Sequence, residues 1–274
     1  MTGFSDGKIE FRLAKSTDEP ESVWMVHDEP IRIAMWSGPR NISTAMMRAW
    51  GNRMDTFVVD EPFYAFYLKT TAKRHPGADE VMASGETDWR RVVAQLLGPL
   101  PESRHKGLSH ILYQKQMTHH LLPGVDRQWL GAMTNCFLIR DPREVIVSYI
   151  KKQGDPTLED LGFAQQAEIF DWVRQKTASV PPVIDAGDVQ QNPERVLRRL
   201  CDAVGVEFSE SMLSWAPGFR ETDGIWAQHW YGEVARSTSF RPHQPKAGPV
   251  PERLRQIYER CRECYKRLYK YRLH

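Results

Sequence analysis

Short apolar segments alternate with helix-like segments from Ile31 to about Trp215, and this alternation limits the chain to few folds. Such short apolar segments are typical of buried strands, which we expect at Ile31–Trp36, Thr56–Val59, His110–Gln114, Thr134–Ile139 and Pro182–Asp185. Helices are expected at Thr44–Arg53, Phe63–Arg74, Thr87–Leu97, Pro142–Lys152, Leu158–Ala178 and Pro193–Val204. The pattern predicts a three-layer α/β/α fold around a central parallel sheet. Ligands of such sheets bind beyond the carboxyl ends of the strands, so residues that follow strands are the first functional candidates.

A length of 274 residues suits one large α/β domain, which we place at residues 31–274. Residues 1–30 are interpreted as an N-terminal extension with a candidate edge strand around Ile9–Leu13. The Pro- and Gly-rich segments "HPGADEVMASGE" and "RPHQPKAGPVPER" are interpreted as surface loops of this domain rather than as linkers.

Composition excludes several classes of protein. No stretch approaches about 20 consecutive apolar residues, so we expect no membrane span. The N-terminus is polar and lacks the apolar centre of a signal peptide. Four cysteines scattered over this length do not make a disulfide framework. The expected location is therefore the reducing cytoplasm.

The C-terminal segment 251–274 is basic, with eight Lys or Arg against three Glu. Apolar residues recur in it at helical spacing, so one face of a helix is expected to pack on the domain: Leu254, Tyr258, Cys261, Tyr265 and Leu268. The preferred interpretation of the charges is a solvated helix face, and a positive field for an anionic ligand stays open. A nucleic-acid or membrane surface is disfavoured. Cys261 and Cys264 fall inside this helix, which favours packing over a metal or redox site.

The segment "SGPRNIST" joins the first expected strand to its helix. Gly38 and Pro39 suit a sharp turn, and the N–H groups at a helix start point toward any anion there. Ser43 and Thr44 add hydroxyl donors, and Arg40 adds a permanent charge. The Gly-Lys-Ser/Thr of the common nucleotide loop is missing. The segment indicates an oxyanion site, and the alternative is an ordinary turn with a capping serine.

A second oxyanion site is indicated by "NCFLIRDPREVIVSYIKK". Arg140 follows a buried strand, and Asp141 and Pro142 suit the start of a helix. Ser148 lies about two turns into that helix, on the side that faces the strand end. In the alternative interpretation, Arg140 only pairs with Asp141 or Glu144.

The segments "PRNIST" and "RDPREVIVS" together resemble the sulfotransferase family that uses 3′-phosphoadenosine 5′-phosphosulfate (PAPS). The later segment "PVIDAGDVQQNPERVLRRLCDAVGVEFSESML" is similar to another part of that family, so the resemblance covers roughly Ile31 to Trp215. It implies a P-loop NTPase-like fold, PAPS as co-substrate, a small-molecule acceptor and no metal. It also implies that the 5′-phosphosulfate is bound by Arg40, Asn41, Ile42, Ser43 and Thr44, and the 3′-phosphate by Arg140 and Ser148.

Three departures from the family pattern affect these expectations. Ile42 occupies the position of the loop glycine, so the loop either has negative φ there or binds the co-substrate differently. An arginine at position 40 resembles the tyrosylprotein and several bacterial branches. The Arg-Lys-Gly element of the cytosolic branch is absent, and "ARSTSFRP" resembles instead a segment of the tyrosylprotein branch. This makes Ser237 a candidate near the 3′-phosphate.

Sulfuryl transfer needs a cation on the transferred group and a base for the acceptor hydroxyl. Arg40 suits the first role by position. In branches with an arginine in the loop, the base tends to be a glutamate after the second strand, which favours Glu61. Asp60 is the nearby alternative, and either carboxylate is also a candidate cap for the helix that follows Pro62.

A histidine base is the second choice. In "ILYQKQMTHHLLP", Lys115 matches the lysine of the cytosolic Lys-Thr-His element, but Met117 stands where its histidine would be. His119 and His120 follow, and we rank His119 after Glu61 as a catalytic candidate.

Aromatic residues near these positions are candidates for an acceptor pocket or for the core: Phe63, Tyr64, Phe66, Tyr67, Trp226, Trp230 and Tyr231. They suit a hydrophobic alcohol, a phenol or a quaternary ammonium. Two other functions stay open. One is a kinase-like phosphoryl transferase, which the missing lysine loop and Mg²⁺-binding acid disfavour. The other is a non-catalytic nucleotide-binding module.

Overall fold

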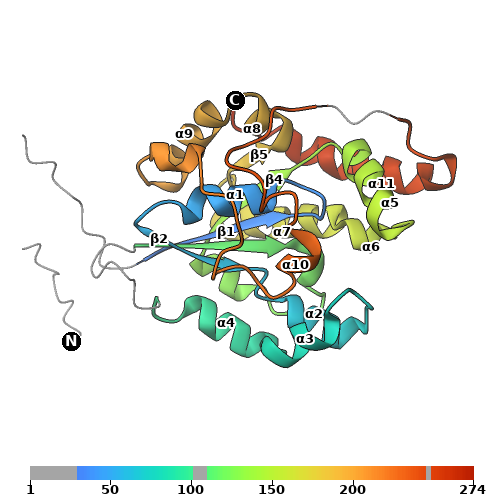
Figure 1. Ribbon diagram of the computed structural model, residues 1–274, viewed down its shortest axis with the longest axis horizontal. Helices are drawn as coiled ribbons and strands as arrows, with labels where there is room; N and C mark the ends of the chain where they lie inside the picture. The colour runs from blue at the N-terminus through green and yellow to red at the C-terminus, as the bar shows by residue number, and fades with distance from the viewer. Residues whose placement is uncertain (1–29, 101–109, 245–247) are drawn as a thin grey trace, which may run out of the picture.

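The computed structural model describes residues 30–100, 110–244 and 248–274. Five parallel strands form one sheet in the order β2-β3-β1-β4-β5 (Figure 1). The strands are β1 Ile31–Ser37, β2 Thr56–Asp60, β3 Ile111–Met117, β4 Thr134–Ile139 and β5 Val183–Asp185. Because β1 is central, the loop that follows it lies between the ends of β3 and β4.

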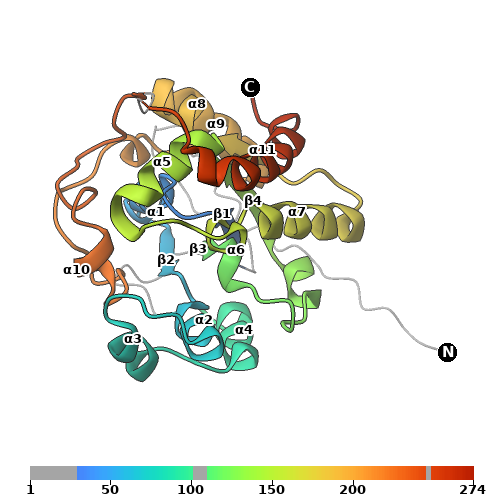
Figure 2. The same ribbon diagram turned by 90° about the vertical axis from the view of Figure 1, so that its right-hand side faces the viewer.

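Helices cover both faces of the sheet (Figures 1 and 2). They are α1 Ser43–Gly51, α2 Tyr64–Thr71, α3 Ala78–Ser84, α4 Trp89–Leu97, α5 Pro142–Gln153, α6 Leu158–Leu161, α7 Phe163–Thr177, α8 Ala186–Gln191, α9 Pro193–Val204, α10 Ala227–Trp230 and α11 Arg255–Tyr269. Short 3₁₀ helices lie at Thr118–His120, Gln128–Ala132, Glu210–Leu213 and Glu252–Leu254.

The alternation of side chains along β1 divides the core into two layers. Ile33 and Met35 pack with buried residues of α1, α8 and α9. Ala34 and Trp36 point the other way and pack with buried residues of α4, α7 and α11. The predicted three-layer α/β/α fold with a central parallel sheet is therefore confirmed.

Several boundaries differ from the sequence predictions. The helix expected at Leu158–Ala178 is divided into α6 and α7 at Gly162, whose φ is 71°. A Cβ at Gly162 would collide with the Thr118 hydroxyl, so the helix breaks where it approaches the end of β3. The strand expected at His110–Gln114 extends to Met117.

Three α-helices of the described residues were not predicted, α3, α8 and the short α10, and one expectation lies outside the described residues. The segment interpreted as the loop "HPGADEVMASGE" contains α3, anchored by the buried Val81. Helix α8 follows β5 directly, and the Asp185 side chain caps it by accepting from the N–H groups of Gly187 and Asp188. The candidate edge strand at Ile9–Leu13 lies outside the described part of the chain.

The basic C-terminal segment forms α11 and packs on the domain as expected. Leu254, Cys261 and Leu268 are buried, and the other apolar positions of this face are half-buried. Burial raises the pKa of the Cys261 thiol to about 12, so this cysteine is a protonated packing group. Within the described ranges, no helix is both long and apolar enough to cross a membrane.

Gly38 allows the chain to turn closely past α6 at the end of β1. A Cβ at this position would lie 2.7 Å from the carbonyl oxygen of Leu161. We therefore predict that Gly38→Ala lowers the free energy of unfolding by about 1–3 kcal/mol, the usual cost of overpacking, as measured by urea denaturation. The matched control is Gly124→Ala, where a Cβ meets nothing within 4 Å and the change should stay within about 0.5 kcal/mol. Equal effects of the two substitutions would contradict this account.

Candidate active site

A cavity of about 790 Å³ lies at the carboxyl edge of the sheet. The ends of β1, β2, β3 and β4, the C-terminal half of α5 and the segment 228–244 contribute to its walls. All the predicted site residues line this one cavity: Arg40, Asn41, Ile42, Ser43, Thr44, Glu61, His119, Arg140, Ser148 and Ser237. The structure therefore brings together residues that are up to about 200 positions apart in the sequence.

The loop after β1 has its left-handed residue at Arg40, with φ of 55°, and not at Ile42, with φ of −93°. Ile42 therefore takes its place without strain and packs against the core. No side chain caps α1, which disagrees with the alternative of an ordinary turn closed by a serine. The N–H groups of the first turn and the hydroxyls of Ser43 and Thr44 are donors at this end of the cavity.

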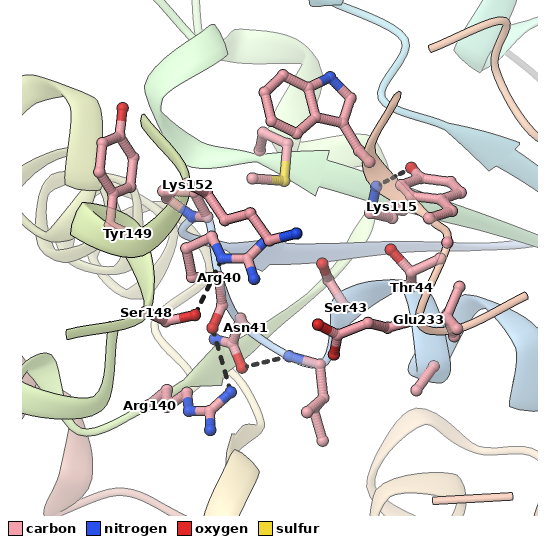
Figure 3. Close-up of a pocket in the computed structure, with 18 of the residues that line it drawn as sticks. Arg40, Asn41, Ser43, Thr44, Lys115, Arg140, Ser148, Tyr149, Lys152 and Glu233 are labelled. Carbon is pink, nitrogen blue, oxygen red and sulfur yellow. Dashed lines mark hydrogen bonds between the residues drawn. The ribbon is translucent and has the colours of Figure 1, made fainter. Parts of the chain in front are cut away.

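Asn41 has a role that the sequence did not suggest. Its side-chain Nδ2 donates to the Leu138 carbonyl oxygen at 3.0 Å. Its Oδ1 accepts from the Ile42 N–H at 2.9 Å (Figure 3). The side chain thus ties the loop to the neighbouring strand β4. This holds the loop in the conformation in which Arg40 has positive φ.

Arg40 and Arg140 belong to one connected group. Arg40 Nε donates to Ser148 Oγ at 3.1 Å, and Arg140 donates to the Arg40 carbonyl oxygen at 3.1 Å (Figure 3). Burial lowers the pKa of Arg40, which Glu233 opposes and Arg140 reinforces. A half-buried guanidinium is a stronger partner for an oxyanion than an exposed one, because less solvent competes for it.

Arg140 also pairs with Glu144, as the alternative interpretation of this residue expected. Its Nε and one terminal nitrogen donate to the same Glu144 oxygen at 3.0 and 2.8 Å. The other Glu144 oxygen lies 2.9 Å from His243 Nε2. Burial alone would raise the pKa of Glu144, but Arg140 and His243 outweigh it and hold the pKa below its usual value. The arginine is thereby fixed in direction at the cavity wall.

Ser237 belongs to the segment 228–244 and lines the cavity. Its hydroxyl donates to the Val234 carbonyl oxygen at 2.7 Å and accepts from Trp215 Nε1 at 3.2 Å. These two bonds fix the segment locally, so the hydroxyl also has a structural role.

Lys115 is the centre of a buried network on the other side of the cavity. Only 1% of this residue is exposed, and its ammonium donates to Asp60 Oδ1 at 2.9 Å, to the Tyr231 hydroxyl at 2.5 Å and to Glu61 Oε1. Tyr231 donates to Asp60 at 2.8 Å, and the Gly224 N–H donates to Asp60 at 3.0 Å. Burial alone lowers the pKa of Lys115, but the two carboxylates outweigh it and the pKa is raised.

The two carboxylates have different environments. Asp60 is buried and fully engaged, and neither it nor Glu61 caps α2, whose N-cap is Phe63. Burial raises the pKa of Asp60, which Lys115 opposes. Glu61 follows β2 with φ of 41° and keeps 12% of its side chain exposed at the cavity. Glu61 is therefore the carboxylate that a ligand can reach.

His119 and His120 lie on the 3₁₀ helix that follows β3, and both are buried. Burial lowers the pKa of each well below the usual value, so both imidazoles are neutral at neutral pH. The His120 ring stacks with the rings of Tyr64 and Tyr67, with centroid distances of 4.8 and 4.6 Å. Its Nδ1 is 3.9 Å from Glu61 Oε2. The histidine that the structure places beside Glu61 is thus His120, although the sequence favoured its neighbour.

The aromatic candidates divide between the cavity and the core. Four line the cavity: Tyr64, Tyr67, Trp230 and Tyr231. Phe63 and Phe66 belong to the core, and Trp226 packs edge-on against Tyr64. Other lining residues had no signal in the sequence: His75, Met117, Tyr149 and Lys152. His75 comes from the segment taken for a surface loop, and its Nδ1 is 2.8 Å from the Tyr64 hydroxyl.

Comparisons with known proteins agree with this arrangement. A family model described as "Sulfotransferase domain" matches residues 31–270. Two proteins of Arabidopsis thaliana are similar in sequence. Branched-chain-amino-acid aminotransferase-like protein 1 is 35% identical over 221 residues, 81% of this chain and 38% of its own length. Branched-chain-amino-acid aminotransferase-like protein 2 is 31% identical over 233 residues, which are 85% of this chain and 40% of its own length. The chain thus spans about two fifths of the length of these relatives.

Among solved structures, a sulfotransferase from Alicyclobacillus acidocaldarius matches with a TM-score of 0.50 and 13% identity. The match covers 90% of this chain and 98% of that one. At this identity the similarity concerns the fold, and it agrees with the parallel α/β sheet described above.

The Lys115 network makes a testable contribution to stability. We predict that Lys115→Met lowers the free energy of unfolding by about 3–5 kcal/mol, because two neighbouring carboxylates lose their only close cation among the described residues. The loss should shrink as the pH falls, since the raised pKa of Asp60 favours its protonation in the folded state. Urea denaturation at neutral and mildly acidic pH measures both effects. Lys151→Met, at an exposed position of α5, is the control, and an equal loss there would contradict the prediction.

Proposed function

Because the chain belongs to the sulfotransferase domain family, we propose that it transfers the sulfuryl group of PAPS to a hydroxyl or amine of a small-molecule acceptor. One observation carries this proposal. A single cavity holds a cationic loop at a helix start, a second arginine with a serine, and a strand-end carboxylate. These are the groups that sulfuryl transfer needs from a protein: anion binding, charge stabilisation and a base.

The donors in the cavity suit the two anionic ends of PAPS. Arg40, Ser43 and Thr44 would hold the 5′-phosphosulfate at the start of α1. Arg140 and Ser148 would hold the 3′-phosphate. Because Arg140 donates to the Arg40 carbonyl oxygen, the two groups of donors keep a fixed separation, which favours a ligand with two anions at one spacing. When bound, PAPS supplies the sulfuryl group.

The protein's own residues divide the chemistry between them. Arg40 would stabilise the charge that grows on the sulfuryl oxygens and on the departing nucleotide. Glu61 would accept the proton of the acceptor hydroxyl through an oxygen that faces the cavity. Lys115 binds the other oxygen of Glu61, which fixes this carboxylate in direction. Tyr64, Tyr67 and the rings near them would form the wall against which the acceptor lies.

The aminotransferase-like names of the two plant relatives are not used to assign an activity to this chain. They describe aminotransferase-like proteins, of which this chain spans about two fifths. The family model covers the same part of the chain, so we assign sulfuryl transfer to it. All four cysteines lie in the described ranges and are unpaired, which supports the proposed reducing, cytoplasmic location.

The first prediction here is a preference for the 3′-phosphate. Calorimetric titration should give tighter binding of 3′-phosphoadenosine 5′-phosphate than of ADP, which lacks the 3′-phosphate. Arg140→Ala should weaken binding of the 3′-phosphorylated nucleotide by roughly 2–4 kcal/mol, and Ser148→Ala by about 1 kcal/mol. ADP affinity should change little in both variants. Equal or tighter binding of ATP with Mg²⁺ would favour the kinase-like alternative.

A second prediction separates nucleotide binding from chemistry. Arg40→Ala should lower turnover by about 10²-fold or more, with a smaller effect on nucleotide affinity, because its charge is needed most in the transition state. Glu61→Gln should keep nucleotide affinity and lower turnover by roughly 10²–10⁴-fold. If Glu61→Gln is active and His119→Ala is inactive, Glu61 is not the base.

A further inference from the structure

We propose that His120 is a positioning residue for Glu61. In this role its Nδ1–H donates to Glu61 Oε2, the carboxylate oxygen that Lys115 does not bind, and fixes the direction in which the carboxylate faces the acceptor. The inference rests on the proposed function of Glu61 as the base.

The two oxygens of Glu61 have different surroundings. Oε1 accepts from Lys115 and lies 3.4 Å from the Tyr231 hydroxyl. Oε2 has His120 Nδ1 at 3.9 Å, about 1 Å longer than a hydrogen bond. The terminal torsion of a glutamate is broad, so small changes of several Glu61 side-chain torsions together can close this gap while Oε1 stays within reach of Lys115. The result would be a carboxylate held at both oxygens by residues of different elements.

The Nδ1 atom of His120 needs a partner of this kind. It is buried and has no hydrogen-bond partner among the residues that the structure describes. A buried polar atom without a partner is costly, and such atoms in native proteins usually find one. The Glu61 carboxylate is an acceptor within reach of His120 Nδ1, because its Oε2 lies 3.9 Å from that atom.

The ring of His120 is itself held in place. Two tyrosines stack with it, Tyr64 at an interplanar angle of 3° and Tyr67 at 28°. Both tyrosines come from α2, which begins three residues after Glu61. The segment that supplies the carboxylate therefore also fixes the ring beside it, so the Nδ1 direction is set by the fold.

The surroundings of the His120 ring favour a neutral imidazole that donates through one N–H. Burial, His75 and Lys115 all lower the pKa of His120. Lys115 approaches from β3, His75 from the turn after α2, and Asp60 and Glu61 from the end of β2. A neutral imidazole carries one N–H, and the carboxylate beside Nδ1 favours the tautomer with the proton on that atom.

Two substitutions test this role because they remove the same ring. Asparagine places an amide nitrogen near the position of Nδ1, and glutamine places one near Nε2. The assay is kcat of the full chain with PAPS and 2-naphthol as the probe acceptor. We expect His120→Asn to stay within about threefold of the parent, and His120→Gln to lose about tenfold, the effect of one hydrogen bond. Affinity for 3′-phosphoadenosine 5′-phosphate should be the same in both variants, which also shows that they are folded.

A second readout needs no acceptor. Nitrogen spectra of the protein labelled with ¹⁵N-histidine report which ring nitrogen carries the proton, and His120→Asn identifies the signal. We expect the proton on Nδ1, with a signal that moves in Glu61→Gln. The proton on Nε2, or equal losses of turnover in His120→Asn and His120→Gln, would overturn the inference. Full turnover in Glu61→Gln would instead overturn the proposed base, while the spectra still decide the contact.

Discussion

The side of the cavity that contains Glu61 depends on one buried ammonium group. Lys115 lies on β3, and its partners come from the end of β2 and from the segment after α10. Without this cation, Asp60 and Glu61 would be two adjacent carboxylates in a site with little water, an arrangement that is strongly unfavourable. The lysine therefore does more than pair charges. It joins the C-terminal segment, with Tyr231, to the edge of the sheet and so closes one wall of the cavity.

The central fold could be predicted because its signals are local. Ile33 and Met35 alternate with Ala34 and Trp36 along β1, and each pair belongs to a different core layer. The missed details depend on contacts between distant segments. Gly162 divides α6 from α7 through its positive φ and lies so close to Thr118 that a side chain would collide, and no periodicity in the helix itself reveals this neighbour.

The site was predictable for the residues that directly follow strands. Arg40, Glu61 and Arg140 follow the first, second and fourth strands, and the geometry of parallel sheets places such residues at one edge. The choice between His119 and His120 was not predictable, since a 3₁₀ turn changes the direction of successive side chains in a way that spacing does not encode. The wall formed by residues 228–244 has little regular structure and gave no periodic signal.

The backbone at Arg40 and Glu61 has a consequence for how such a site can change. Both residues have positive φ: Arg40, in the loop after β1, has φ of 55°, and Glu61, directly after β2, has φ of 41°. For a residue with a side chain, this conformation costs about 1–2 kcal/mol, and glycine would adopt it freely. A chain selected only for resistance to unfolding would thus drift toward glycine at these two turns and lose its guanidinium and its carboxylate. Resistance to unfolding therefore favours glycine at positions 40 and 61, whereas the charges in the cavity require an arginine and a glutamate there.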